Sequence, residues 1–157
     1  ADEKKYFPMF VDLTQKKVTV IGAGNIAKRR IETLLSFAGT IEVIAPDACE
    51  RIKELAKEGR LVWKEKEYDR EDLYDADLVL SATNNEKVNN DVYSACKCLG
   101  ISVNTASNRM KCDFYFPSIL QKEETVIGLN SAGNPAKTKN VRKEMQKWIE
   151  EAGEKHE

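Results

Sequence analysis

The stretch Val18-Thr19-Val20-Ile21-Gly22-Ala23-Gly24-Asn25-Ile26-Ala27 decides the fold of this chain. Its first four residues are mostly β-branched and predict a short buried strand that ends at Gly22. From Asn25 to Gly39 the apolar residues recur with the period of a helix. The positions on this helix face are Ala27, Ile31, Leu34, Leu35 and Ala38. A strand, a glycine turn and an amphipathic helix together form the start of a βαβ unit.

The same alternation continues as far as residue 113. Further strands are expected at 41–45, from 61, at 78–82 and at 101–104. Helices are expected at 49–58 and over 86–99, and a short helical turn within 69–77. Strands that alternate with helices indicate parallel pairing, with helices on both faces of the sheet. Residues 1–113 are therefore predicted to form an α/β domain with a Rossmann-like doubly wound parallel sheet.

The pattern changes after Asp113. Residues 114–120 and 125–130 are predicted to be two strands of a hairpin, joined by the charged turn at 121–124. A last helix follows, with an apolar face made of Val141, Met145, Trp148, Ile149 and Ala152. A region of about 45 residues is too small to hold a core alone. We expect residues 114–157 to pack on the first domain or on a second subunit.

Composition sets limits on the class of protein. The chain has 157 residues, 41% of them hydrophobic and 32% charged, and a net charge of -1. This balance predicts a globular domain with no overall attraction to nucleic acid or to a membrane surface. No apolar run approaches the roughly 20 residues that span a bilayer, and residues 1–5 are unlike a signal peptide. We therefore expect a cytoplasmic protein.

Cysteine and histidine offer little for catalysis or metal binding. The four cysteines are Cys49, Cys96, Cys98 and Cys112, and their spacing does not match a zinc site. We interpret them as small buried thiols. The only histidine, His156, lies beside the C-terminus. The chemistry is therefore expected to need neither a metal nor a histidine.

The glycine turn carries the clearest functional signal. Gly22 permits the tight turn after the strand, Gly24 allows a pyrophosphate to approach the backbone, and the small Ala27 lets the helix sit close to the strand. Free amides at the start of the helix would then bind the phosphates. The motif is short, and the alternative is a turn that serves packing only. Its place between a strand and an amphipathic helix favours a dinucleotide.

Other cofactor contacts are expected after the second and fourth strands. The carboxylate that binds the adenosine ribose usually lies about 20 residues beyond the glycines, which leaves Asp47 as the candidate. Asp47 could instead be the N-cap of the following helix. The basic run 28–30 is interpreted as a solvated helix face, so NAD is favoured over NADP. Thr83 ends the fourth strand, where ligands of such sheets bind, although it could also be an ordinary helix start.

Several motifs together resemble the precorrin-2 dehydrogenase family, which includes the N-terminal part of bacterial siroheme synthases. They follow the family's order over nearly the whole chain, and the last two are the most specific. They are Phe7 to Leu13, Gly22 to Ala27, Ala45-Pro46, Ala82 to Asn89, Gly100 to Asn104 and Cys112 to Ser118. The resemblance implies NAD-dependent oxidation of precorrin-2 to sirohydrochlorin. It also implies a homodimer formed by the hairpin and the last helix, and an NAD site lined by Asn25, Ile26, Pro46 and Asp47.

Two features depart from the family pattern. Several members carry an aspartate shortly after the Val103-Asn104 pair, and Ser107 occupies that position here. Ser107 is the candidate catalytic residue, but a hydroxyl does not accept a proton readily near neutral pH. This argues against ferrochelatase activity. The chain is also shorter than the family pattern, which normally continues into a C-terminal helical region.

The resemblance also suggests where the substrate binds. Precorrin-2 carries many carboxylates, so cations should flank its site, and Lys137, Lys139 and Arg142 are candidates at the start of the last helix. Ser131 matches a serine of the family's equivalent loop, and Asn104 belongs to the Val-Asn pair. A solvated helix face and an ordinary turn serine are the plainer interpretations. Two alternative functions stay open, a sirohydrochlorin metal chelatase and a non-catalytic NAD-sensing module.

Overall fold

The computed structural model describes residues 4–154 and divides the chain into two compact units. The sheet unit comprises Phe10–Phe114. The hairpin unit comprises the described residues up to Met9 and those from Tyr115 onward. His156 lies outside the described residues.

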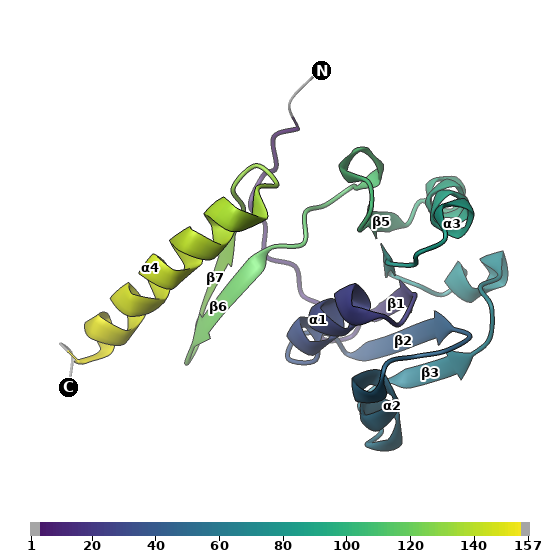
Figure 1. Ribbon diagram of the computed structural model, residues 1–157, viewed down its shortest axis with the longest axis horizontal. Coiled ribbons are helices and arrows are strands. Elements are labelled where there is room, and N and C mark those ends of the chain that lie inside the picture. The colour runs from purple at the N-terminus through teal and green to yellow at the C-terminus, as the bar shows by residue number, and fades with distance from the viewer. Residues whose placement is uncertain (1–3, 155–157) are drawn as a thin grey trace. The chain divides into compact units, whose positions relative to one another are not determined.

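The sheet unit is built on five parallel strands in the order β3-β2-β1-β4-β5 (Figure 1). The strands are β1 (Lys17–Ile21), β2 (Thr40–Ala45), β3 (Val62–Glu65), β4 (Leu78–Ser81) and β5 (Ser102–Thr105). The helices between them are α1 (Asn25–Leu34), α2 (Glu50–Lys57) and α3 (Glu86–Leu99), with a 3₁₀ turn η1 (Arg70–Leu73) before β4 and another, η2 (Arg109–Lys111), after β5. The predicted Rossmann-like α/β fold is confirmed.

Both faces of the parallel sheet are covered by other elements. β1 is almost entirely buried, as a strand must be when both faces of its sheet are covered. On one face, Ile21 and Val79 pack with Leu73 of η1 and Val92 of α3. Right-handed crossovers place α1 and α2 on the opposite face. The carboxyl ends of β2, β1, β4 and β5 consequently lie side by side along one edge of the sheet.

One predicted boundary and one predicted surface position in the sheet unit were wrong. α1 ends at Leu34 instead of reaching Gly39, and residues 35–37 form turns in which the Ala38 N–H still donates to Leu34 O. A Cβ built on Gly39 would lie 2.1 Å from Thr14 O, so the chain must leave the helix to pass this loop. Arg30 was expected on a solvated face, but it is partly buried and donates to Asn104.

The cysteines are less uniform than predicted. Cys96 is fully buried in the core below the sheet, whereas Cys49 and Cys112 are partly buried and Cys98 is exposed. Cys96 and Cys98 lie two positions apart on α3, so they point to different sides of the helix. The expectation of buried thiols holds for Cys96 and was wrong for Cys98.

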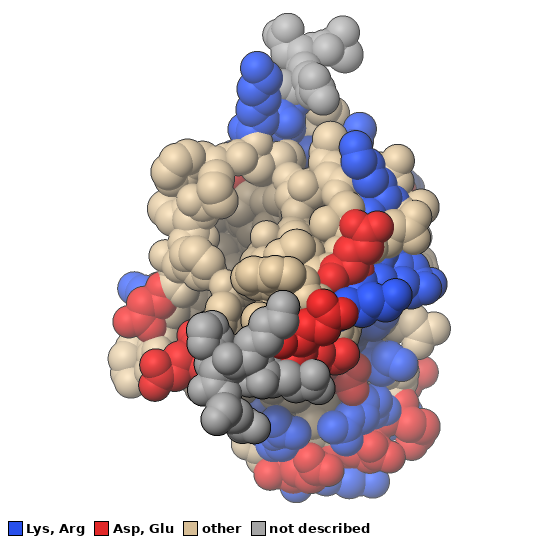
Figure 2. Space-filling model, turned by 90° about the vertical axis from the view of Figure 1, so that its left-hand side faces the viewer, with Lys and Arg blue, Asp and Glu red and all other residues tan. Residues whose placement is uncertain are grey.

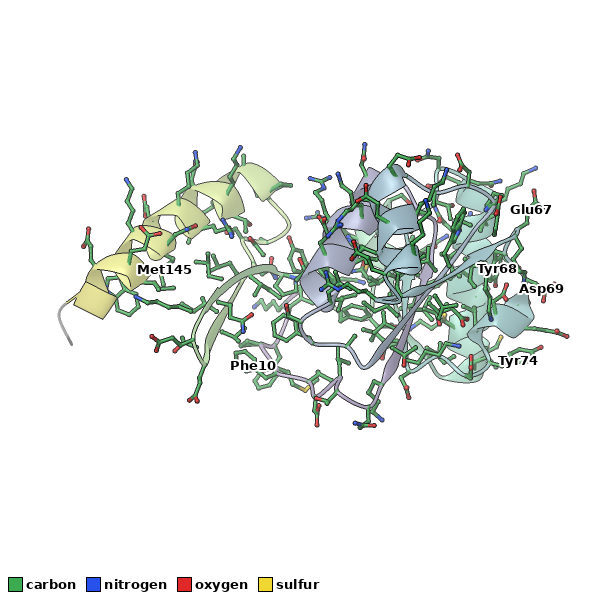
Figure 3. The ribbon with its side chains drawn as sticks, turned by 90° about the horizontal axis from the view of Figure 1, so that it is seen from below. Phe10, Glu67, Tyr68, Asp69, Tyr74 and Met145 are labelled. Carbon is green, nitrogen blue, oxygen red and sulfur yellow. The ribbon has the colours of Figure 1, made fainter. Side chains whose placement is uncertain are left out.

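The hairpin unit contains an antiparallel pair and one long helix. β6 (Ser118–Lys122) pairs with β7 (Thr125–Leu129), and α4 (Pro135–Glu154) contacts β6. The first strand begins later than predicted, at Ser118, because Phe114 to Phe116 make no ladder and Pro117 has no N–H to donate. The turn is only Glu123-Glu124, with Glu123 at φ 52°. On the predicted apolar face of α4, Trp148 is exposed and Met145 is partly buried (Figure 3 labels Met145).

The surface carries charges of both signs. Figure 2 shows Lys and Arg side chains lying among Asp and Glu side chains on the viewed side, as the net charge of -1 would suggest. Within residues 4–154, none of the helices combines the length and the apolar character needed to traverse a bilayer.

Candidate functional site: the carboxyl edge of the sheet

The turn after β1 contains two glycines, and the fold requires a glycine at only one of these positions. Gly22 has φ 106°, and a Cβ built on it would lie 2.4 Å from Ala82 O. Only glycine fits there, because both the backbone angle and the neighbouring turn exclude a side chain. Gly24 has an ordinary φ of -89°, and no described atom lies within 4 Å of a Cβ built on it. The described protein therefore gives no folding reason for glycine at position 24.

The first turn of α1 is open toward the same space. Gly24 is its N-cap, and no side chain among residues 4–154 caps it. By contrast, the Asn85 side chain caps α3 by accepting from the N–H groups of Lys87 and Val88. The start of α1 thus combines uncapped amides, the positive end of a helix dipole and space above Gly24, which suits a phosphate group. These features fit the pyrophosphate of a dinucleotide.

The side chains at the start of α1 leave this space accessible. Asn25 and Ile26 are exposed, whereas Ala27 is fully buried against the sheet. The buried Ala27 agrees with the prediction that a small residue lets the helix sit close to the strand. The Cys49 N–H donates to Ala23 O, which fixes the turn against the start of α2.

The second part of the site lies after β2, where Pro46 and Asp47 are exposed. Asp47 is not the N-cap of α2, because Cys49 holds that position. The Asp47 carboxylate instead lies 3.0 Å from Lys53 Nζ. The Lys53 ammonium and the Ala48 N–H hold the pKa of Asp47 below its usual value, so this exposed carboxylate stays ionised.

The turn after β4 forms the third part. Thr83 is partly buried, and its Oγ1 lies 2.7 Å from Asn89 Oδ1 and 3.0 Å from Asn85 O. Its own backbone N–H donates to Asn89 Oδ1 at 3.3 Å. The Thr83 hydroxyl is therefore held by its neighbours at the edge where Gly22 and Pro46 also lie.

Two predicted site residues near β5 differ in exposure: Ser107, after the strand, is exposed, and Asn104, within it, is buried. Ser107 is exposed, and its Oγ lies 3.5 Å from Asn89 Nδ2, at the limit for a hydrogen bond. Asn104 is 4% exposed; its Oδ1 accepts from Arg30 Nη1 at 2.5 Å and its Nδ2 donates to Phe114 O at 2.9 Å. Each bond uses one of the two hydrogen-bonding positions on its atom, so a contact between Asn104 and a substrate is limited by its burial and not by these bonds.

The remaining predicted substrate residues belong to the hairpin unit. Ser131 is partly buried in the turn before α4, where its carbonyl accepts from the Asn134 N–H. Lys137 is exposed in the first turn of α4, and Arg142 is partly buried and donates to Gln146 one turn further on. The structure therefore brings the predicted cofactor residues and Ser107 to one edge, whereas these three lie in a separate unit.

A surface pocket of about 310 Å³ lies beside α3, and none of its lining residues comes from the glycine turn after β1. It is lined by Tyr68, Asp69, Arg70, Lys87, Val88 and Asp91. Figure 3 labels Tyr68 and Asp69 in the segment that follows β3. Arg70 pairs with Asp91 at 2.6 Å, and Tyr68 donates to the same carboxylate. Arg70, Asp91 and Tyr68 therefore already satisfy one another, and the other two charged lining residues, Lys87 and Asp69, have opposite signs, so the pocket shows no preference for a charged ligand.

Sequence reasoning missed two residues that shape the edge. Asn89 lies fully buried under it, and Arg30 reaches across to β5. A signal for Asn89 was present, because an asparagine three residues before Val92 falls on the inward face of α3. No comparable signal existed for Arg30, since its partner is 74 positions away.

Residues 9–118 match the model of a family described as putative NAD(P)-binding. The chain belongs to this NAD(P)-binding family. The match spans the glycine turn and all five strands of the sheet, so the cofactor of this chain is a nicotinamide dinucleotide.

Similar proteins narrow the family further. The chain is 35% identical over 146 residues to a siroheme synthase of Pseudoalteromonas atlantica, covering 92% of this chain and 32% of the relative. It is 37% identical over 143 residues to a probable multifunctional siroheme biosynthesis protein HemA of Ruminiclostridium josui, covering 90% and 28%. The chain thus spans about a third of the length of these curated relatives.

The fold is also similar to a solved structure. SirC, a precorrin-2 dehydrogenase, superposes with a TM-score of 0.72 at 26% identity, covering 90% of this chain and 70% of that one. Together with the siroheme relatives, this confirms that the chain is a member of the precorrin-2 dehydrogenase family.

Proposed function

We propose that this chain catalyses the NAD⁺-dependent oxidation of precorrin-2 to sirohydrochlorin. Bound NAD⁺ supplies the hydride acceptor, and the substrate loses a hydride to it and a proton to solvent. The observation that carries the proposal is Gly24, which the fold does not require to be glycine and which borders the uncapped start of α1. We infer that the substrate is precorrin-2 from the names of the siroheme relatives and of SirC.

The chain's own residues act mainly by binding and orientation in this proposal. Backbone amides from Gly24 to Ala27 hold the pyrophosphate, and Gly22 lets the turn after β4 pack against this loop. Gain of conjugation in the product drives the reaction, so little acid–base help is needed. We place Ser107 against the substrate as a contact, since an exposed hydroxyl does not accept a proton at neutral pH.

We infer NAD⁺ rather than NADP⁺ from the end of β2. Asp47 presents an exposed, ionised carboxylate there. Such a group accepts hydrogen bonds from the ribose hydroxyls of NAD⁺ and repels the 2′-phosphate of NADP⁺. Because Asp47 also pairs with Lys53, its preference for NAD⁺ depends on the hydroxyl contacts as well as on charge.

We propose four residues as substrate contacts. Lys137 and Arg142 supply positive charge for the carboxylates of the tetrapyrrole, and Ser131 and Asn104 supply polar contacts. We further propose that the active form is a homodimer in the cytoplasm. The exposed Phe7, Met9 and Trp148 of the hairpin unit support the dimer, since large apolar side chains of this kind favour an interface.

The deciding experiment mixes the chain with precorrin-2 and NAD⁺ and follows sirohydrochlorin absorbance and NADH fluorescence together. Equal amounts of both products are expected, and the Gly24→Asp variant is expected to form neither. NAD⁺ binding without turnover would contradict the proposal and favour a sensing module. Sirohydrochlorin incubated with Fe²⁺ or Co²⁺ in the same assay tests the chelatase alternative, for which we expect no metal insertion.

A further inference from the structure

Asn89 is a polar residue that is buried among apolar side chains of α3. It lies on the inward face of α3 and is 0% exposed, in a helix whose neighbouring inward residues are Val92, Ala95 and Cys96. A buried amide is costly unless its donors and acceptor are all used. The hydrogen-bond partners of the Asn89 amide therefore indicate the role of this residue.

The oxygen of Asn89 accepts from three groups of two residues at the end of β4. Ser81 Oγ lies 2.9 Å from Asn89 Oδ1, Thr83 Oγ1 lies 2.7 Å from it, and the Thr83 N–H donates to it at 3.3 Å. Ser81 is itself 0% exposed, so this side chain has no access to water as an alternative partner.

The nitrogen of Asn89 reaches the opposite side of the same turn and beyond it. It donates to Thr83 O at 3.0 Å, and its second N–H faces Glu86 Oε1 at 3.4 Å and Ser107 Oγ at 3.5 Å. Asn89 thus binds both the N–H and the C=O of Thr83, which fixes the orientation of its amide group. One side chain joins the turn after β4 to the loop after β5.

The turn that Asn89 holds is the one that touches the phosphate loop. A Cβ built on Gly22 would lie 2.4 Å from Ala82 O and 3.1 Å from the Thr83 N, so the two turns are in close contact. We propose that Asn89 is a positioning residue for the nicotinamide cofactor: it holds the Thr83 turn against the Gly22 turn and sets the affinity for NAD⁺. This inference rests on the proposed function and adds a residue that has no contact with the cofactor itself.

The positioning role makes a specific prediction about Thr83. If Asn89 acts through the turn, then removing Asn89 and removing the Thr83 hydroxyl must affect NAD⁺ binding through one shared interaction. Two such changes are not additive. A residue that merely stabilises the fold would lower the melting temperature and leave the dissociation constant of the folded protein unchanged.

The test measures NAD⁺ binding by calorimetry for the full chain, Asn89→Ala, Thr83→Val and the double variant. Asn89→Ala is expected to raise the dissociation constant on the order of tenfold, because a displaced turn no longer meets the cofactor. In the Asn89→Ala background, Thr83→Val should add less than about twofold. The control is Asn90→Ala, the exposed neighbour on α3, with wild-type affinity expected.

Unchanged affinity in a folded Asn89→Ala variant, or additive effects of the two changes, would overturn the inference. Should Asn89→Ala not fold, Ser81→Ala decides, because it removes the 2.9 Å bond that anchors the Asn89 oxygen; a rise in the dissociation constant supports the role and no rise refutes it. A wild-type chain that binds NAD⁺ but does not oxidise precorrin-2 would refute the proposed function while leaving this inference standing. A wild-type chain that binds no NAD⁺ would refute both.

Discussion

At the scale of single residues, Gly22 and Gly24 separate folding from function within one motif. Gly22 is required by its φ of 106° and by the nearby Ala82 carbonyl, whereas Gly24 has neither constraint. The structure agrees with the separate roles that the motif gives the two glycines, because only Gly24 is free to serve the ligand alone.

Substitution at these two glycines should give opposite results. Gly24→Asp is expected to abolish NAD⁺ binding and to change the melting temperature little, since the new side chain enters open space and places a negative charge where the phosphates bind. Gly22→Ala should instead prevent folding or strongly lower the melting temperature, because its Cβ meets backbone. Calorimetry and thermal unfolding distinguish the two, and undiminished NAD⁺ affinity in Gly24→Asp would refute the phosphate-loop assignment.

Ser107 should matter little to the rate. Its hydroxyl is exposed and makes one long contact, with Asn89, so Ser107→Ala is expected to keep turnover within about threefold of wild type if positioning dominates catalysis. Steady-state kinetics with saturating NAD⁺ measure this. A fall of about a thousandfold, the size typical of a lost acid–base group, would show that Ser107 takes part in proton transfer.

The cysteines of α3 should differ sharply in reactivity. Burial, helped by the Asp113 carboxylate, raises the pKa of the Cys96 thiol to about 12, whereas Cys98 is exposed. Since the thiolate is the reactive form, an alkylating reagent at pH 8 should modify Cys98 quickly in the native protein and leave Cys96 unmodified. Mass spectrometry of the labelled peptides checks this, with denatured protein as the control in which both react. Fast native labelling of Cys96 would contradict its burial.

At the scale of elements, a chain of charges joins the first three strands of the sheet. Lys17 on β1 lies 3.1 Å from Glu42 on β2, and Lys64 on β3 lies 3.0 Å from the same carboxylate. Glu42 is only 7% exposed, so its charge depends on these partners. Lys17 also pairs with the exposed Asp75 at 2.8 Å.

Removing Lys17 should destabilise this part of the sheet. Lys17→Met is expected to lower the free energy of unfolding at pH 7 by about 1–3 kcal/mol, because it leaves Glu42 buried with one cation. The matched control is Lys16→Met, whose exposed pair with Asp77 at 3.9 Å should contribute less than about 0.5 kcal/mol. Urea unfolding measures both, and equal effects of the two variants would contradict the role of Glu42.

The contribution of Lys17 should also depend on pH. Burial by itself lowers the pKa of Lys17, but the Asp75 and Glu42 carboxylates outweigh it and raise the pKa above the ordinary 10.5. A raised folded-state pKa stabilises the protein at every pH below the unfolded value, and this stabilisation is lost as the pH rises through the folded value. The gap in stability between wild type and Lys17→Met should therefore be constant from pH 7 to 9 and narrow above about 10.5. A gap that widens at alkaline pH would contradict this.

At the scale of the whole molecule, the predicted functional residues are divided between the two compact units. The sheet unit contains every predicted cofactor residue and Ser107, and the hairpin unit contains Ser131, Lys137 and Arg142. The hairpin unit also exposes large apolar side chains, with Phe7 86%, Met9 72% and Trp148 61% exposed. A region this small and this apolar is expected to find a partner surface.

We expect that partner to be a second copy of the chain. Light scattering should give a mass twice the 17.8 kDa of one chain. Trp148→Glu should shift the mass toward that of the monomer, because it places a charge in a desolvated interface. The neighbouring Lys147→Glu changes charge on the same helix and should remain dimeric if Trp148 is the contact. A monomeric wild-type protein would refute the dimer.

The sequence by itself determined the elements and the phosphate turn. Strand and helix periods are local properties, and so is the strand–glycine–helix order around Gly22 to Ala27; for this reason the α/β architecture was predictable, and the cofactor edge stays a prediction that follows from it. Tertiary structure alone decided that Arg30 binds Asn104, that Asn89 joins Thr83 to Ser107, that Cys98 faces solvent and that α1 ends at Leu34. Each of these depends on contacts between segments that are brought together only when the sheet forms. No local pattern encodes such contacts, because their energy depends on distance in space and not on separation along the chain.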